Sequence, residues 1–224
     1  ATVRVGTSPA GVAVSPDGRR VYVTNPESKD LFVLDGEEPR VLNRVQVGDG
    51  PLGVAVSPDG DRVYVADWYD DVVFVLDARD LTQVARIAVG DSPSGLAVSP
   101  GGDKLYVSER DDDSVAVVDT RENRVIARVK VGRRPFGIQV DRAGERLYTA
   151  NVASNDMTIV DLAGPRVVAT IPVGSTPYAV AVTPDGRRTF VTNQHANTVS
   201  VIDTGSGGVI LEREVGEFPE GIIV

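Results

Sequence analysis

The sequence predicts an all-β fold, a β-propeller built from four-stranded blades, and three markers with one period carry that prediction. A glycine after a valine, a proline three residues later and an aspartate at the end of an apolar segment each recur every 42 residues. Propeller blades contain four strands in a repeat of similar length. A parallel β-helix stacks shorter turns, and a β-sandwich needs no fixed period. The markers are Gly6, Gly48, Gly90, Gly132, Gly174 and Gly216; Pro9, Pro51, Pro93, Pro135, Pro177 and Pro219; and Asp35, Asp77, Asp119, Asp161 and Asp203.

The second repeat shows three inner strands in order. Residues 53–57 are small and apolar, as a crowded innermost strand requires, and Asp59-Gly60 favours a tight hairpin after them. Residues 62–66 contain the β-branched and aromatic side chains typical of a strand. Residues 73–77 follow a polar loop and form the third strand.

The fourth strand of each repeat is predicted to lie outermost. Residues 84–89 alternate between polar and apolar side chains, as a half-exposed strand does. In the fourth repeat this strand contains Pro172, which cannot donate to a strand ladder and is tolerated mainly at a sheet edge. Both observations favour an edge position.

Five complete repeats run from Gly11 to Val215, and both ends of the chain resemble parts of one further blade. Thr2–Val5 aligns with a fourth strand and Gly221–Val224 with a first strand. We therefore predict one domain over residues 1–224, with five complete blades and a partial sixth formed by the terminal strands. An open sheet edge must be covered. Three explanations stay open: a fragment of a longer ring, a second chain that fills the gap, or an unusual closed ring.

Composition excludes several classes of function. The formal net charge is −9 and the pI about 4.7, which disfavours nucleic acid as a partner, because phosphate binding needs a cationic face. Apolar runs are far shorter than the roughly 20 residues that a membrane helix needs. The absence of Cys removes disulfides and thiolate nucleophiles, and a single His rules out a multi-histidine metal site. We predict neither a metal nor a cofactor.

One segment of each repeat resembles a known family. Pro16–Asn25 reads PDGRRVYVTN, and its last four residues spell the motif of YVTN-type propeller repeats. The resemblance extends over essentially the whole chain and implies an extracellular, periplasmic or cell-surface protein. It is poorly specific for activity, because related propellers include ring-opening lyases, lactonases and subunits of periplasmic redox enzymes. Variants of the motif stand at residues 64–67, 106–109, 148–151 and 190–193.

The strand order predicts two faces of different character. Loops from a fourth to a first strand and from a second to a third strand should form one face, here called the loop face. The Asp-Gly hairpins and the turns after third strands should form the opposite hairpin face. The loops differ between repeats whereas the hairpins hardly do, so we predict function on the loop face.

The residue after the recurring proline should lie at the centre of the loop face. Here Phe136 and Tyr178 either fill differing gaps or form the aromatic floor of a pocket. The residues at this position are Ala10, Leu52, Ser94, Phe136, Tyr178 and Glu220.

The loops between second and third strands contain further candidates. Trp68, beside Tyr69, either plugs a gap against the next blade or stacks on a partner. Arg110, and Arg134 in a neighbouring loop, either hold a carboxylate or phosphate or offset nearby acidic residues.

The acidic loop and the single histidine are the candidates for chemistry. Asp111, Asp112 and Asp113 with Glu109 form the densest carboxylate group, but consecutive acids lack the alternating spacing of a Ca²⁺ loop, and a solvated charge run is the alternative. His195 is either an exposed loop residue or a general base with an acid such as Asp111 as its partner. One histidine cannot reproduce the His-containing arrangement of the ring-opening lyases.

Two repeated positions are predicted to be structural. The aspartate after the third strand recurs in every repeat and should accept hydrogen bonds from the turn that follows. Asn25, Asn151 and Asn193 should begin loops.

The sequence thus favours a non-catalytic, extracytoplasmic scaffold that binds a protein, peptide or glycan through its loop face. The alternatives are a lyase or lactonase on the same face, with His195 and Asp111 as catalytic residues, and a structural surface-layer module. We expect no nucleic acid and no membrane span, and a second chain that completes the partial blade stays open. The predicted binding residues are Trp68, Tyr69, Arg110, Arg134, Phe136, Tyr178 and His195.

Overall fold

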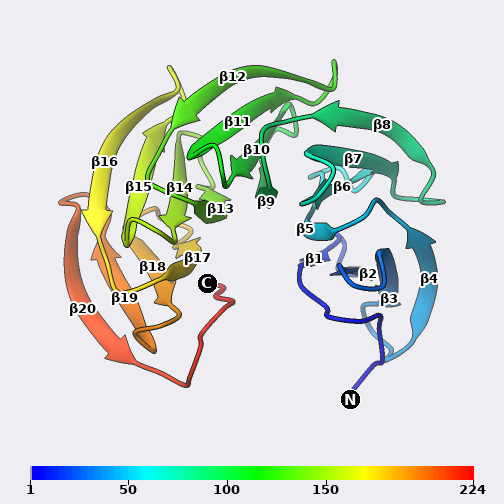
Figure 1. Cartoon of the computed structure of the whole chain (residues 1–224), viewed down its shortest axis with the longest axis horizontal. Coiled ribbons are helices and arrows are strands. Elements are labelled where there is room, and N and C mark those ends of the chain that lie inside the picture. The colour runs from blue at the N-terminus through cyan, green and yellow to red at the C-terminus, as the bar shows by residue number, and fades with distance from the viewer. Residues whose placement is uncertain (1) are drawn as a thin grey trace. The chain divides into compact units, whose positions relative to one another are not determined.

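The computed structural model describes residues 2–224, and these residues form strands and turns without a helix. Every strand belongs to one of five four-stranded antiparallel sheets, in which strands consecutive along the chain are neighbours (Figure 1). The first sheet contains β1 (Val12–Val14), β2 (Arg20–Asn25), β3 (Asp30–Asp35) and β4 (Val41–Gln46). The second contains β5 (Pro51–Val56), β6 (Arg62–Asp67), β7 (Val72–Asp77) and β8 (Gln83–Ala88).

The other three sheets repeat this order. The third contains β9 (Pro93–Val98), β10 (Lys104–Glu109), β11 (Ser114–Asp119) and β12 (Arg124–Lys130). The fourth contains β13 (Pro135–Val140), β14 (Arg146–Asn151), β15 (Asp156–Asp161) and β16 (Arg166–Pro172). The fifth contains β17 (Pro177–Val182), β18 (Arg188–Asn193), β19 (Thr198–Asp203) and β20 (Gly208–Glu214). The predicted all-β fold with five complete propeller blades is confirmed.

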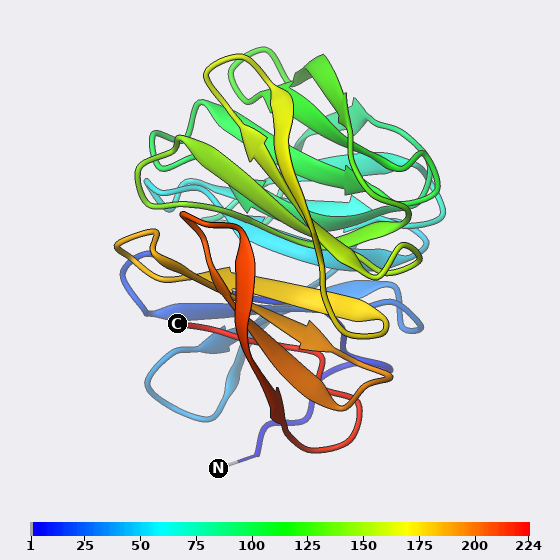
Figure 2. The same cartoon turned by 90° about the vertical axis from the view of Figure 1, so that its left-hand side faces the viewer.

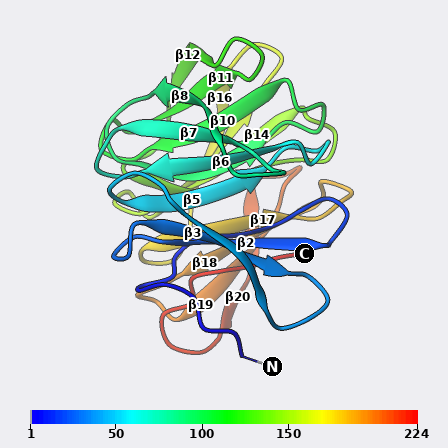
Figure 3. The same cartoon turned by 90° about the vertical axis from the view of Figure 1, so that its right-hand side faces the viewer.

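The chain divides into two compact units. Unit 1 comprises the chain up to Val107 together with Val118–Ile126, and unit 2 comprises Ser108–Val117 and Ala127–Val224. Within unit 1, β1 and β2 lie against β5 (Figure 3), and β5 and β6 lie against β9. Within unit 2, β13 and β14 lie against β17 (Figure 2). Each sheet therefore covers one apolar face of its neighbour in the same unit.

The fourth strand is the edge of its sheet, as the sequence predicts. In the fourth sheet the order is β13-β14-β15-β16, and Pro172 at the end of β16 is exposed. Only one side chain of this strand, Ile171, is buried. The third strand, β15, is buried along most of its length because it has a partner on each side.

Packing between neighbouring sheets forms the cores. In unit 1, Tyr22 and Leu31 of the first sheet pack with Val63, Val65 and Phe74 of the second. No sheet could hide these side chains by itself, so stability accumulates through contacts between neighbours. The corresponding cluster of unit 2 contains Tyr148, Met157, Ile159, Val191 and Ile202.

The aspartate after each third strand has the predicted structural role. Asp35 Oδ1 accepts hydrogen bonds from the backbone N–H groups of Glu37 and Glu38, at 3.0 and 3.2 Å. These donors favour the ionised carboxylate and lower the pKa of Asp35. Asp77, Asp119, Asp161 and Asp203 accept equivalent bonds from the backbone N–H groups of Arg79, Arg121, Ala163 and Ser206.

The recurring asparagines do more than begin loops. Asn25, Asn151 and Asn193 are fully buried at the ends of their strands. Asn151 Nδ2 donates to Asp156 Oδ1 at 2.6 Å and to Thr158 Oγ1 at 2.9 Å. This position therefore ties the second strand to the third inside the sheet.

The chain ends depart from the prediction in one respect. Residues 2–5 and 219–224 lie outside the strands, so the sixth blade is only partial and the expected terminal strands do not form. Residues 2–224 offer them no second and third strand of a sixth blade to pair with. The Glu220 carbonyl nevertheless accepts a hydrogen bond from Thr192 Oγ1, as the Leu52 carbonyl does from Thr24 Oγ1. The segment after β20 thus meets the fifth sheet as a first strand would, and a second chain at this position stays a prediction.

Candidate functional site on the loop face

Four pairs of residues, at positions that recur in both units, anchor loops of the loop face. An Asx side chain at the end of a second-to-third-strand loop accepts a hydrogen bond from a backbone N–H in the following fourth-to-first-strand loop. Both residues of each pair have a left-handed backbone, with φ between 49° and 57°. The bond holds residues such as Arg134 in a region that non-glycine residues seldom adopt. The pairs are Asp71–Ser92, Asp113–Arg134, Asn155–Thr176 and Asn197–Phe218, at 2.8 to 3.0 Å.

Two aromatic rings meet on the loop face of unit 2. Phe136 and Tyr178 are the second residues of the neighbouring strands β13 and β17, and both are half-buried. Their rings stack with centroids 4.2 Å apart and planes inclined by 30°. The rings thus form an aromatic platform, and its use by a ligand stays a prediction.

An arginine–carboxylate cluster belongs to the same unit. Arg110 Nη1 lies 2.8 Å from Asp111 Oδ1, and Arg134 Nε lies 3.7 Å from the same oxygen. The Arg134 side chain is 54% exposed and that of Arg110 20%. One carboxylate therefore faces two guanidinium groups, and Arg134 presents its group to solvent.

Charged groups connect this cluster to the aromatic platform. Burial raises the pKa of the Tyr178 phenol, the nearby Glu220 carboxylate raises it further, and the Arg110 guanidinium opposes both. Glu220 Oε1 also accepts a hydrogen bond from Gln194 Nε2 at 3.2 Å. Gln194 and Glu220 are not among the predicted site residues, although Glu220 stands at the repeat position of Phe136 and Tyr178.

His195 is exposed and contacts neutral groups. Its Nδ1 lies 3.0 Å from Thr176 Oγ1, and its ring packs edge-on against Phe218 with centroids 6.1 Å apart. Within the described chain no ion pair joins His195 to a carboxylate, and Asp111 pairs with Arg110 instead. A general-base role of His195 with Asp111 as its partner stays a prediction.

Glu109 and Asp113 of the acidic loop have separate structural roles. Glu109 is fully buried, where both its oxygens accept from Arg128 Nε at 3.1 Å and one accepts from Ser114 Oγ at 2.7 Å. Asp113 holds the backbone of the next loop, as described above. In residues 2–224 no three His, Asp or Glu side chains gather as metal ligands would.

Trp68 and Tyr69 belong to unit 1, whereas the other predicted site residues belong to unit 2. Trp68 is half-buried and its backbone N–H donates to the Gly50 carbonyl at 2.9 Å. Tyr69 is 72% exposed. This arrangement is compatible with both interpretations of Trp68.

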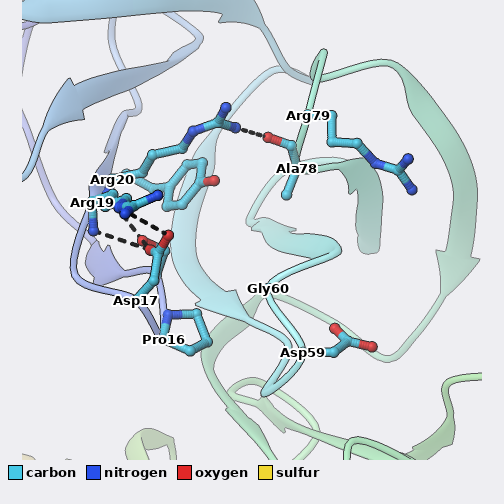
Figure 4. A pocket seen from close by; sticks show the side chains of 10 residues that line it. Pro16, Asp17, Arg19, Arg20, Asp59, Gly60, Ala78 and Arg79 are labelled. Atoms are coloured by element: carbon cyan, nitrogen blue, oxygen red, sulfur yellow. Dashed lines mark hydrogen bonds and ion pairs between the residues drawn. The ribbon is translucent and has the colours of Figure 1, made fainter.

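Cavities also open on the hairpin face, where the sequence reasoning places no function. In unit 1 a cavity of about 340 Å³ is lined by residues that include Arg20, Tyr22, Asp59 and Arg79 (Figure 4). In unit 2 a cavity of about 220 Å³ occupies the equivalent place, and eight of its nine lining residues stand 126 positions after residues that line the unit 1 cavity. None of the predicted site residues lines either cavity. The sequence signal that could have indicated these cavities is a difference in charge between equivalent hairpin positions, for example Arg19 in the first repeat and Glu145 in the fourth.

Comparisons with known proteins agree with this geometry. Residues 78–166 match a family model described as Lactonase, 7-bladed beta-propeller. Kuenenia stuttgartiensis hydrazine synthase is similar in structure, with a TM-score of 0.73 and 18% identity over all of this chain and 91% of that one. The chain is a β-propeller. A functionally unknown protein from Desulfotomaculum acetoxidans DSM 771 resembles this propeller with a TM-score of 0.82 and 18% identity, over 94% of this chain and 71% of that one.

These likenesses define the fold and leave the activity open. The family model covers less than half of the propeller, and the two structural relatives share too little sequence to carry more than the fold. No curated protein matches this propeller. Across residues 2–224, no helix is of a length and apolarity to cross a membrane.

Proposed function

We propose that this propeller is a non-catalytic scaffold that binds a protein segment, a peptide or a glycan on the loop face of unit 2. The observation that carries the proposal is the stacking of Phe136 on Tyr178 beside the charges of Arg110 and Glu220. An aromatic platform offers its surface to a sugar ring or an apolar side chain. Charged groups at its rim select the polar groups of the same ligand.

The surroundings of the candidate catalytic residues support binding over reaction. General acid–base catalysis needs a titratable side chain within hydrogen-bond reach of the proton that it transfers. His195 is hydrogen-bonded to a threonine hydroxyl, and Asp111 is ion-paired with Arg110. Both side chains are therefore engaged in contacts that stabilise loops.

The YVTN-type resemblance supplies the setting of this proposal. In the first blade, Asn25 is a buried tie between the second and third strands, so this residue of the motif serves the blade rather than a ligand. We place the scaffold outside the cytoplasm, at the cell surface or in the periplasm, because the resemblance implies that setting.

Glycan and peptide arrays probed with the labelled protein test the proposal. Ligands captured by the wild type should be lost with Phe136→Ala and with Tyr178→Ala, and weakened by Arg110→Gln. Leu52→Ala, at the same repeat position in unit 1, is the matched control and should retain them. Equal capture by Tyr178→Ala and the wild type would refute the loop-face site.

Lactone hydrolysis is the second candidate, because the matched lactonase model covers Arg110, Asp111, Arg134 and Phe136. A panel of aliphatic and aromatic lactones, followed by pH-stat titration, measures this activity. Turnover that disappears in both His195→Ala and Asp111→Asn would favour hydrolysis over the scaffold. Turnover absent from the wild type removes the candidate.

A further inference from the structure

The hairpin cavity of unit 1 is rich in guanidinium groups. Its lining contains three arginines and two aspartates in a protein whose net charge is −9. Arg19 and Arg79 stand at its rim, with side chains 80% and 76% exposed. Arg20 is half-buried, and its Nη1 donates to the carbonyl of Ala78 in the next sheet (Figure 4).

Competition inside the first sheet explains why Arg20 turns into the cavity. At the same position of the second sheet, Arg62 Nη1 pairs with Asp77 Oδ2 at 3.1 Å. The equivalent Asp35 is instead held by Arg40, through Nε and Nη2 at 3.0 and 2.7 Å. Among the residues that the structure describes, Arg20 forms no ion pair.

The Tyr22 hydroxyl is a second polar group of the cavity. Tyr22 lines the cavity and is 1% exposed, yet its hydroxyl makes no hydrogen bond within the described chain. This hydroxyl is not one of the buried polar atoms of the chain, so it is accessible in the cavity and can donate a hydrogen bond there. A ligand oxygen in the cavity would accept that bond.

The two aspartates of the lining are committed to their hairpins. Asp17 Oδ1 accepts from Ser15 Oγ at 2.6 Å and from the Arg19 backbone N–H at 3.0 Å. Asp59 Oδ1 accepts from the Asp61 backbone N–H at 3.0 Å and from Ser57 Oγ. These bonds hold the turns closed and leave Arg20 as the cation of the cavity wall.

We propose that the hairpin cavity of unit 1 binds the carboxylate or phosphate group of a small organic anion through the Arg20 guanidinium and the Tyr22 hydroxyl. A guanidinium offers a planar fork of donors that matches both oxyanions. A half-buried charge is screened less than a rim charge, so Arg20 contributes more than Arg19 or Arg79. The volume of about 340 Å³ limits the ligand to a small molecule.

The equivalent cavity of unit 2 provides an internal contrast. Arg146 and Tyr148 stand 126 residues after Arg20 and Tyr22 and line it. Its lining holds two arginines, Arg142 and Arg146, against three acids, Asp141, Glu145 and Asp185, whereas the unit 1 cavity holds three arginines against two aspartates. The same framework therefore disfavours an anion in unit 2.

Isothermal titration of the whole chain with inorganic phosphate and, separately, with succinate tests the site and distinguishes the two chemistries. We expect one saturable site for at least one anion. Arg20→Gln should weaken its binding about tenfold or more, and Arg20→Lys, which keeps the charge without the fork, by less. Tyr22→Phe should weaken binding severalfold without lowering the melting temperature, because it removes only a hydroxyl with no partner in the chain.

Arg146→Gln is the matched control and should leave the affinity unchanged. Circular dichroism melting confirms that each variant is folded before titration. Failure of both anions to bind the wild type would overturn the proposal. Wild-type affinity in folded Arg20→Gln, or equal losses in Arg20→Gln and Arg146→Gln, would overturn it as well. These outcomes are independent of the loop-face scaffold, whose residues belong to unit 2.

Discussion

Unit 1 and unit 2 place different residues at the same positions of one repeat. At the start of the first strand, unit 1 has Leu52 and Ser94 where unit 2 has Phe136 and Tyr178. At the first hairpin, unit 1 has Arg19 where unit 2 has Glu145. Unit 2 thereby gains an aromatic platform on its loop face, and unit 1 gains a cationic cavity on its hairpin face.

The strands between these faces show no such divergence. Tyr22 and Tyr148 occupy one position and are each 1% exposed, and Val65 and Val191 occupy another and are each fully buried. Buried side chains must fill the space between two sheets, so their size and polarity are constrained. Turn and loop residues meet solvent and can change charge at little cost. The comparison teaches that function on this scaffold should be sought where equivalent positions disagree.

The largest expected effect tests the shared core. Val65→Asp and Val191→Asp should each lower the free energy of unfolding by about 4 kcal/mol or more, because each buries a charge without a partner. Urea unfolding followed by circular dichroism measures both. Val84→Asp, on the exposed edge strand β8, is the control and should change little. A wild-type midpoint for either core variant would show that the two cores differ.

A smaller effect on stability should distinguish two equivalent hydrogen bonds, that of Thr24 to the second sheet and that of Thr192 to the segment after the fifth sheet. Thr24 Oγ1 accepts from the Gly11 N–H at 2.9 Å and donates to the Leu52 carbonyl at 2.6 Å. Thr24→Val should therefore cost about 1–3 kcal/mol of stability, the penalty for unsatisfied buried groups. Thr192→Val should cost less, because its bond to the Glu220 carbonyl is longer, at 3.3 Å, and Glu220 is exposed. A greater loss in Thr192→Val, measured by chemical denaturation, would contradict this order.

Both units should share one response to acid. Backbone N–H donors lower the pKa of Asp35 and Asp119 in unit 1 and of Asp161 and Asp203 in unit 2. The stability that these groups contribute is fully present above their ordinary pKa of 3.8 and is lost as the pH falls through the lowered values.

The melting temperature should therefore be level from pH 7 to about pH 5 and fall below about pH 4. Asp119→Asn and Asp161→Asn should each make this fall of the melting temperature at acid pH, the acid limb, less steep, since an asparagine does not titrate in this range. Differential scanning calorimetry across the pH range measures the limb. A limb unchanged in both variants would exclude these carboxylates as its cause.

The smallest expected effect concerns Trp68. If its half-buried ring serves a partner, Trp68→Ala should lower the free energy of unfolding by less than about 1 kcal/mol. A loss above about 3 kcal/mol, typical of a buried large-to-small substitution, would show that the Trp68 ring fills space against the next blade. Urea unfolding of Trp68→Ala decides between these two roles of Trp68. Tyr69→Ala is the control, because the Tyr69 side chain is 72% exposed.

The blades could be predicted because their signals are local. The Asp59-Gly60 turn, the β-branched run of β6 and the edge proline Pro172 each act within a few residues of themselves. The recurrence of these signals every 42 residues then implied sheets that stack on one another. The turn-binding role of Asp35 followed in the same way, because its partners are two and three residues away.

The candidate sites were only partly predictable. The stacking of Phe136 on Tyr178 joins equivalent positions of adjacent blades, which periodicity relates. The contacts that His195 and Asp111 form, with Thr176 and Arg110 respectively, depend on competing partners, and the spacing of residues along the chain does not show which contact forms.

The sequence by itself determined the number of complete blades, the strand order and the structural aspartates, because each rests on contacts within one repeat. Only the tertiary structure decided where side chains with identical local sequence point. Arg20 and Arg62 both precede Val-Tyr-Val, yet Arg62 pairs with Asp77 while Arg20 reaches the Ala78 carbonyl. The physical reason is competition for one carboxylate, since Arg40, in the turn between β3 and β4, holds Asp35 and leaves Arg20, which lies opposite Asp35 on β2, facing the cavity.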